Sequence, residues 1–253
     1  MPPVPRPPAT RRGPDRNLVL AIAVAALVAA ALIVGSIVLS GGGGTSTAPA
    51  QGSTEGRTTG AGASGGIAFL DGIPQHGTVL GNPDATVRLL QYEDLQCPIC
   101  RRYTEDALQT IVEEYVRPGK VKLDFRGLAF LGADSDKALR VALAAGRQNR
   151  LWHVVELFYR EQGEENSGWV TDAKVDEILG RVPDLDAAKV KRDAHSAGIA
   201  KEIAAVAAEA ARRRVPGTPW FYIGVGAGEP YELQPASLTP DAFRPALDGA
   251  LQG

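Results

Sequence analysis

The chain contains only two cysteines, and both lie in the stretch QYEDLQCPICRRY, residues 91–103. The residues at 85–94, ATVRLLQYED, are rich in Val, Leu and Tyr and follow the turn signal GNPD, which predicts a buried strand. Pro98 suits the first position of a helix, because the N–H that proline lacks has no helical partner there. The sequence therefore predicts a strand-to-helix junction with Cys97 at the N-cap and Cys100 one turn later.

Two thiols at a helix N-terminus differ in their chemistry. The unpaired N–H groups and the positive end of the helix dipole face the Cys97 sulfur and stabilise its thiolate. In such settings the pKa of a cysteine falls from about 8.5 into the range of roughly 3.5–7.5, which gives a good nucleophile and a good leaving group. Cys100 lies on the apolar stripe of the helix, with its Cα roughly 5–6 Å from that of Cys97, within reach of a disulfide bond.

Two other uses of the pair are less favoured. A structural disulfide that closes so small a loop removes little chain entropy from the unfolded state. A zinc site needs two further ligands, and His76, His153 and His195 are neither paired nor at metal-ligand spacing. We therefore expect no metal site. A C-x-x-C motif at a strand-to-helix junction instead favours redox chemistry.

An apolar run precedes the motif. Residues Leu18–Leu39 carry no charge over 22 residues, and at about 1.5 Å per residue they can span a hydrocarbon core of roughly 30 Å. We expect a transmembrane helix. A cleaved signal peptide is the alternative, with TAPAQ at 47–51 as its cleavage site. However, a signal-peptide apolar region is usually about 7–15 residues long, and this site lies well beyond the run.

Charge predicts the orientation of this helix. Four arginines lie in the tail 1–17, so the positive-inside rule leaves that tail in the cytoplasm and the chain after residue 40 outside it. Residues 40–66, rich in Gly, Ser and Thr, are expected to form a flexible linker, and the folded domain is expected to occupy 67–253. Both cysteines would then lie in an oxidising compartment. The net charge of −2 gives no basic surplus for nucleic acid.

The rest of the sequence alternates strands and helices. A second strand is predicted at 121–128 and a third at 220–225, with a final helix from Pro240 to Leu251. Between the second and third strands, about 132–212, the pattern is mostly helical, with breaks at GRQN, GEENSG and RVPD. This order predicts an α/β sheet with one long helical insertion.

The chain resembles the DsbA-like thioredoxin-fold thiol:disulfide oxidoreductases. The likeness rests on YEDLQCPIC, on GTPWFYIG at 217–224 and on the helical stretch 128–162, and it covers roughly residues 75–251. It implies a thioredoxin fold with a helical insertion, here behind the N-terminal transmembrane helix and linker. It also implies that Cys97 is the attacking sulfur, that Cys100 is its partner and that the Thr218–Pro219 bond is cis. Thr218 and Pro219 would face the cysteines and bind an extended substrate segment.

Three residues are expected to tune the pair. Pro98 starts the helix, and Ile99 stands where many relatives carry a polar residue, so we expect weaker thiolate stabilisation and a potential below that of DsbA, within roughly −270 to −120 mV. Many relatives also carry a buried carboxylate where this chain has Gln91. Glu93 shares its strand face and could substitute, but the sequence favours a solvated strand end for it.

The resulting functional hypothesis is a membrane-tethered, extracytoplasmic thiol:disulfide oxidoreductase that forms disulfides in exported proteins. Its partners would be unfolded or exported proteins with free thiols. The resemblance further implies a quinone-linked membrane reoxidase of the DsbB or vitamin K epoxide reductase type. No bound cofactor is needed for thiol–disulfide exchange. A reductase or isomerase of the same fold stays open as an alternative, as does a tethered peptide-binding module with incidental thiols.

Overall fold

The structure is a computed structural model that describes residues 66–253. The predicted cytoplasmic tail, the transmembrane helix at 18–39 and nearly all of the linker lie outside these residues. Within 66–253, no helix is both long enough and apolar enough to cross a membrane.

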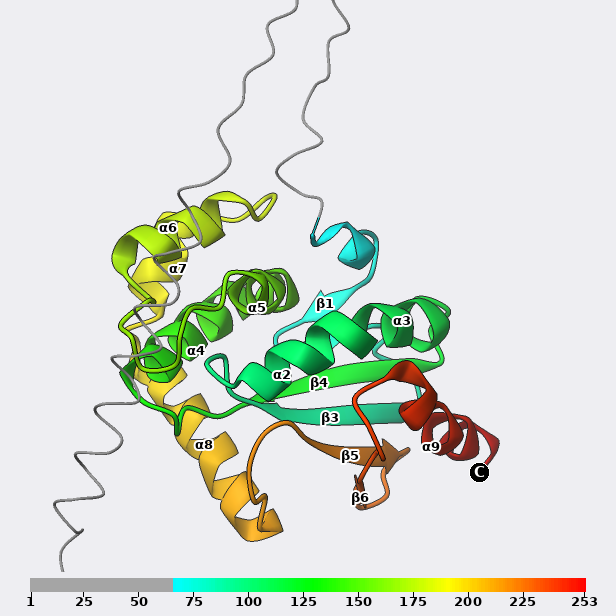
Figure 1. The fold of residues 1–253 in the computed structure, drawn as a ribbon. Coiled ribbons are helices and arrows are strands. Elements are labelled where there is room, and N and C mark those ends of the chain that lie inside the picture. The colour runs from blue at the N-terminus through cyan, green and yellow to red at the C-terminus, as the bar shows by residue number, and fades with distance from the viewer. Residues whose placement is uncertain (1–65) are drawn as a thin grey trace, which may run out of the picture. The chain divides into compact units, whose positions relative to one another are not determined.

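A six-stranded sheet in the order β1-β2-β4-β3-β5-β6 forms the centre of the domain (Figure 1). Its strands are β1 Gln75–His76, β2 Val79–Leu80, β3 Val87–Glu93, β4 Val121–Gly127, β5 Trp220–Val225 and β6 Tyr231–Leu233. β3 runs parallel to β4 and antiparallel to β5. The three predicted strands are confirmed. The two- and three-residue strands β1, β2 and β6 were not predicted, because such short segments show no alternation of apolar and polar residues.

The helices confirm the predicted insertion. They are the 3₁₀ turn η1 Ala68–Leu70; the continuous helical run α2 Pro98–Tyr103, η2 Thr104–Leu108, α3 Gln109–Ile111 and η3 Val112–Val116; then α4 Ala133–Gly146, α5 Leu151–Arg160, α6 Asp172–Gly180, α7 Ala187–Asp193, α8 Ala197–Arg213 and α9 Pro240–Gln252. Segments η2 and η3 have π-helical hydrogen bonding. Helices α4 to α8 all lie between β4 and β5, and α4 to α7 gather at one end of the sheet (Figure 1).

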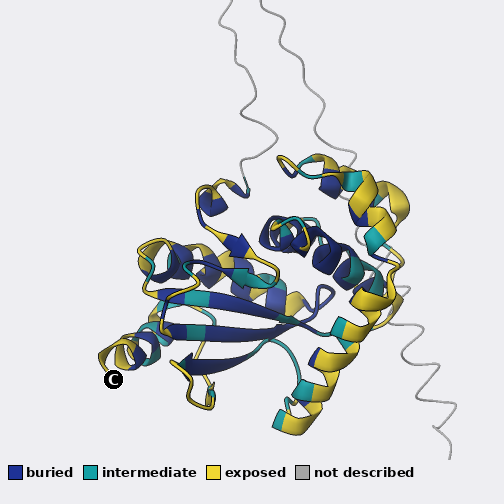
Figure 2. Cartoon of the chain, turned by 180° about the vertical axis from the view of Figure 1, so that it is seen from behind, coloured by how far each residue is buried: buried dark blue, intermediate teal, exposed yellow. Residues whose placement is uncertain are grey.

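Strand β3 is buried on both faces, as its colour in Figure 2 shows. On one face, Tyr103 of α2 meets Phe221 of β5 with ring centroids 4.8 Å apart, and Phe243 of α9 closes the cluster. On the other face, β3 and β5 pack against α8 through the cluster Leu90, Tyr92, Val206, Ala210 and Tyr222. Side chains alternate along a strand, so Glu93 lies on the same face as Phe221, the face that α2 covers.

The buried His153 of α5 makes stability depend on pH. Its Nδ1 is 2.9 Å from the Gln75 amide nitrogen, and burial, with help from the charge of Arg150, lowers the pKa of His153 to about 4. Between about pH 6.5 and pH 4 His153 therefore binds a proton more readily in the unfolded chain than in the folded one, so this residue by itself lowers the free energy of unfolding by about 2–3 kcal/mol as the pH drops through this range. Denaturant unfolding at pH 7 and pH 4.5 should show this contribution as a difference: on acidification His153→Gln should be more favourable to the folded state than the wild type by about 2–3 kcal/mol. The exposed His195→Gln variant is the control, and an equal pH effect in all three proteins would contradict the assignment.

Candidate active site

Helix α2 begins as the sequence predicts. Cys97 has an extended backbone with φ −70° and ψ 117°, and Pro98 occupies the first helical turn. The Cys97 Sγ accepts a hydrogen bond from the backbone N–H of Cys100 at 3.4 Å. The N-cap role that is usually filled by a hydroxyl or carboxylate is thus filled by sulfur.

The two thiols, which are free in this structure, have opposite acidities. Hydrogen bonds lower the pKa of Cys97 to about 6: the largest effect is that of Cys100, and the Thr218 side chain and the backbone of Cys100 and Ile99 add to it against the cost of burial. Cys100 is fully buried, and burial raises its pKa well above the ordinary value. At neutral pH the geometry therefore favours a thiolate at Cys97 and a thiol at Cys100.

Glu93 is the main correction to the sequence analysis. Only 2% of its surface is exposed, so the expected solvated strand end is wrong. The physical reason is helix α5 of the insertion, which covers the end of β3: the Tyr159 hydroxyl donates to Glu93 Oε2 at 2.7 Å. The pKa of Glu93 is raised to about 8: burial has the largest effect, the Tyr159 hydrogen bond opposes it, and the charges of Cys97 and Glu156 add to it.

Gln91, which stands where relatives carry the buried carboxylate, is also fully buried. Neither of its side-chain polar atoms has a hydrogen-bond partner within residues 66–253. The buried ionisable group on this face of β3 is therefore Glu93, two residues nearer to Cys97.

The segment 217–224, which contains Thr218 and Pro219, lies against Cys97. The Thr218–Pro219 peptide bond is cis, as the resemblance implies. The Cys97 thiol donates to the Thr218 carbonyl at 3.3 Å across a sequence separation of 121 residues. Beside this contact runs a groove of about 440 Å³, lined by Ile99, Pro216, Gly217, Thr218, Pro219, Trp220, Pro235, Ala236, Ser237 and Leu238. None of these lining residues carries an ionisable side chain. Ile99, 48% exposed, forms the cysteine side of the groove.

Residues of the insertion and of the loop leading into it also form hydrogen bonds with the loop that precedes Cys97. These contacts were not predicted from the sequence. Gln162, just after α5, donates to the carbonyls of Leu95 at 2.8 Å and Cys97 at 3.3 Å. The buried Asp94 accepts hydrogen bonds from Ser135 and from two backbone N–H groups of the loop that leads into α4. Polar residues beside a motif do not by themselves indicate such contacts, because their partners lie about 36–67 residues away in sequence.

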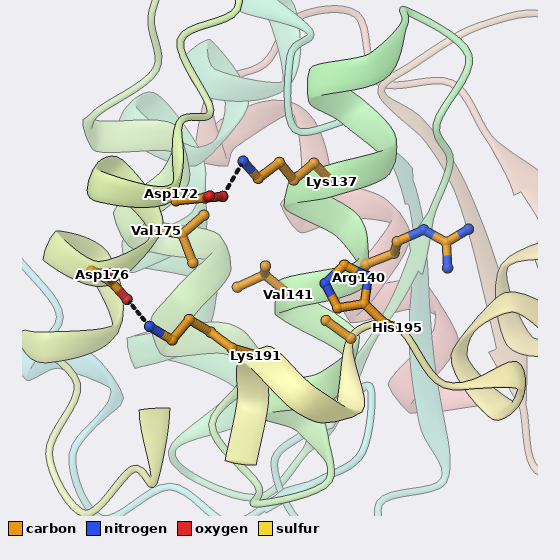
Figure 3. Close-up of a pocket in the computed structure, with 9 residues that line it drawn as sticks. Lys137, Arg140, Val141, Asp172, Val175, Asp176, Lys191 and His195 are labelled. Atoms are coloured by element: carbon orange, nitrogen blue, oxygen red, sulfur yellow. Dashed lines mark hydrogen bonds and ion pairs between the residues drawn. The ribbon is translucent and has the colours of Figure 1, made fainter. Parts of the chain in front are cut away.

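A separate pocket lies in the insertion. It has a volume of about 430 Å³ and is formed by α4, α6, α7 and the residues that follow α7. Four of its charged side chains are paired with one another: Lys137 with Asp172 at 2.6 Å and Lys191 with Asp176 at 2.5 Å (Figure 3). Arg140 pairs with Asp136 of its own helix. Neither cysteine lines this pocket, whereas Cys97 contacts Thr218, which lines the groove described above.

An acidic thiol beside a shielded one, at the end of the central strand of this sheet, defines the class of thioredoxin-fold disulfide oxidoreductases. The chain belongs to the thioredoxin family: the family profile described as Thioredoxin matches residues 75–248. It is similar to the probable disulfide bond formation protein D of Bacillus cereus, with 29% identity over 154 residues, which cover 60% of this chain and 71% of that protein.

Solved structures show the same fold. Oxidised BdbD from Bacillus subtilis aligns with a TM-score of 0.60 and 19% identity, over 72% of this chain and 98% of BdbD. The α-DsbA1 protein of Wolbachia pipientis aligns with a TM-score of 0.58 and 17% identity, over 69% of this chain and 90% of that one. Together with the family match and the curated relatives, these likenesses identify a DsbA-like thiol:disulfide oxidoreductase.

Proposed function

We propose that the chain is a membrane-tethered enzyme that forms disulfide bonds in exported proteins, with Cys97 and Cys100 as its redox-active pair. The observation that carries this proposal is the contrast between the two sulfurs. Cys97 lies beside an uncharged groove, and its pKa is lowered to about 6. Cys100 is buried, and its pKa is raised. A low pKa makes Cys97 the better leaving group, which favours transfer of the disulfide to a substrate.

The proposed reaction consists of two successive thiol–disulfide exchanges. A substrate thiolate attacks Cys97 of the Cys97–Cys100 disulfide, the S–S bond breaks, and Cys100 leaves with the electron pair and takes up a proton. The second substrate thiolate then attacks the substrate sulfur of the mixed disulfide, and Cys97 leaves as a thiolate. The substrate is oxidised by two electrons and the enzyme becomes a dithiol. The reduced pair must then be reoxidised, for which we propose a quinone-linked membrane partner.

Thr218 and Pro219 are proposed to hold the substrate. The Thr218 carbonyl lies 3.3 Å from Cys97 Sγ, so a chain segment that reaches the sulfur must pass along the Thr218 backbone. An extended segment can hydrogen-bond to such a backbone as an added strand does. The uncharged groove beside it suits exported proteins before they fold, because their apolar side chains are still accessible.

The membrane anchor and the extracytoplasmic location are proposed from the sequence alone. The uncharged run Leu18–Leu39, the arginines that precede it and a redox-active cysteine pair are consistent with one another. A membrane-impermeant thiol reagent applied to intact, reduced cells should label Cys97 in a Cys100→Ser variant. Labelling only after cell lysis would contradict the proposed location.

The direction of electron flow has its own test. Cells that express the full chain are quenched in acid, and the free thiols are alkylated with a reagent that adds mass. We expect most of the protein to carry the Cys97–Cys100 disulfide, because an oxidase rests in the oxidised form. A mostly reduced population would contradict the oxidase assignment and favour a reductase or isomerase.

Ile99 is expected to limit the oxidising strength of the pair. Its side chain offers the Cys97 thiolate no hydrogen bond, whereas a histidine at this exposed position could donate a charge-assisted one, worth about 1.5–3 kcal/mol. Ile99→His should therefore lower the pKa of Cys97 and raise the reduction potential by about 30–60 mV. Thiolate absorbance against pH and glutathione redox titration measure the two effects. The matched change Ile99→Leu should move neither, and an unchanged potential in Ile99→His would contradict this role.

A further inference from the structure

Glu156 is a second buried carboxylate near Glu93, and the reaction described so far does not use it. It lies on α5, where every residue from Leu151 to Tyr159 is buried, and it is only 2% exposed. It is also the only carboxylate in that apolar run. A carboxylate is costly to bury without a strong compensating interaction, so its position calls for a physical reason.

One end of the Glu156 carboxylate faces the surface and the other faces the interior. Oε1 accepts a hydrogen bond from Arg160 Nε at 2.7 Å, and the Arg160 side chain is 41% exposed. Oε2 is buried and has no hydrogen-bond partner within residues 66–253. Glu156 is thus in contact with a solvent-accessible cation on one side and keeps a free acceptor on the other.

The charge of Glu156 acts on Glu93, and that of Glu93 acts on Cys100. Tyr159 is three residues after Glu156, hence on the same face of α5, and its hydroxyl donates to Glu93 Oε2 at 2.7 Å. Glu93 is also faced by the charges of Cys97 and Glu156, and its own charge acts on Cys100 and Tyr103. Glu156 is faced by Arg160 of its own helix and by Glu105 of η2.

We propose that Glu156 is a positioning residue that connects Glu93 with solvent, so that Glu93 can supply and recover the proton of Cys100. This inference rests on the proposed function. When a substrate thiolate breaks the Cys97–Cys100 bond, protonated Glu93 gives its proton to the departing Cys100 thiolate and regains one from the Glu156 side. In reoxidation the Glu93 carboxylate takes the proton of Cys100 as that sulfur attacks, and releases it along the same route.

The acidities along the route are ordered for this role. Burial raises the pKa of Cys100 well above its usual value, that of Glu93 to about 8 and that of Glu156 to about 7, where Arg160 partly opposes the effect of burial. Each transfer from Glu156 to Glu93 and on to the departing Cys100 thiolate therefore goes to a stronger base, whereas the reverse transfer during reoxidation is driven by the attack of Cys100 on Cys97. Because the two carboxylates interact, they are expected to titrate as a pair in two steps.

The test follows the mixed disulfide between glutathione and Cys97. The reduced full chain is mixed with oxidised glutathione, quenched in acid at set times and analysed by mass spectrometry. The mixed disulfide disappears when Cys100 attacks Cys97, so its lifetime measures the proton transfer from Cys100. In Glu156→Gln we expect this lifetime at pH 7 to lengthen about tenfold, less than the roughly 100-fold or greater contribution of a directly acting acid–base group.

The pH profile separates this role from a purely structural one. The wild-type rate should rise in two steps near pH 7 and pH 8, and Glu156→Gln should keep only one step, moved below pH 8 because the repulsion by Glu156 is gone. The control is Glu113→Gln, which breaks an Arg–Glu pair of the same 2.7 Å length and i,i+4 spacing on an exposed surface; it should leave both steps in place.

A second variant keeps the test decisive if Glu156→Gln folds poorly. Arg160→Gln retains the carboxylate but removes the charge that lowers its pKa, so the lower step should move upward. A two-step profile in Glu156→Gln, or an unmoved lower step in Arg160→Gln, would overturn the role of Glu156. Failure of the wild type to form any mixed disulfide at Cys97 would instead overturn the proposed function.

Discussion

Replacement of Cys97 by serine is expected to abolish disulfide formation, with the rate of oxidation of a dithiol peptide falling to that of the uncatalysed reaction. A hydroxyl cannot form a disulfide, and its acidity is far too low for the helix N-terminus to produce a nucleophile at neutral pH. The fold should survive, because serine is itself a favoured N-cap residue and can accept the hydrogen bond that Cys97 accepts from Cys100. Peptide oxidation assays and thermal unfolding of the same preparation measure the two effects.

Cys100→Ser is the matched variant, since it removes the other sulfur of the pair. The Cys97 thiolate is then still present and can attack a disulfide, but Cys100 cannot release it from the mixed disulfide, so covalent complexes with disulfide-containing peptides or with oxidised glutathione should accumulate. Non-reducing gels and mass spectrometry would detect these complexes. Activity that persists in Cys97→Ser, or covalent complexes that accumulate in Cys97→Ser and not in Cys100→Ser, would contradict the assigned roles.

Replacement of Glu93 by glutamine is expected to have the next largest effect. The Cys100 thiol has a raised pKa and needs a group that takes its proton when it attacks Cys97; loss of that group should slow the attack about 100-fold. The rise of the rate through the Glu93 pKa of about 8 should disappear with it. The decay of the mixed disulfide with glutathione between pH 6 and pH 9 measures both changes.

The same variant should be more stable than the wild type at high pH. Folded Glu93 keeps its proton up to a pKa of about 8, above its usual value of 4.5. In the folded reduced protein Glu93 therefore keeps a proton that it loses in the unfolded chain between these two pH values, so this residue by itself lowers the free energy of unfolding as the pH rises, by roughly 3–5 kcal/mol in total. Glu93→Gln should lack this part of the loss. Glu232→Gln, an exposed glutamate on strand β6, is the control, and an equal pH effect in both variants would contradict the buried state of Glu93.

The cysteine end of the site could be predicted from sequence because its geometry is local. Cys97, Pro98 and Cys100 lie within four residues, and a proline at the start of a helix fixes where the N-terminal N–H groups point. The strands β3, β4 and β5 carry runs of apolar residues long enough to be recognised. The cis bond at Pro219 was expected only from the resemblance to known oxidoreductases.

The buried carboxylates could not be predicted, because long-range packing decides their burial. Glu93 ends its strand, and nothing in residues 85–94 indicates that Tyr159, 66 residues later, covers it. The sequence does indicate that Glu156 is unusual, since it is the single carboxylate within the apolar run LWHVVELFY. The pattern does not indicate which residues of other elements its side chain faces.

The thiolate of Cys97 links the structure to the direction of the reaction. A pKa near 6 in place of the ordinary 9.0 favours the reduced protein at pH 7 by about 1.4 kcal/mol, which for a two-electron couple raises the potential by about 30 mV. The apolar Ile99 adds nothing further to this stabilisation. The pair should therefore oxidise substrates more readily than one with ordinary thiols, but less strongly than DsbA.

The reduction potential of the Cys97–Cys100 pair tests this account most directly. The full chain, purified in detergent, is equilibrated in glutathione buffers of graded ratio, quenched in acid and alkylated, and the fraction of dithiol is read by mass. We expect a reversible two-electron couple with a potential above roughly −270 mV and below roughly −120 mV. A potential at or below the lower value, or no reversible exchange between the dithiol and the disulfide, would contradict the assignment of this chain as a disulfide donor.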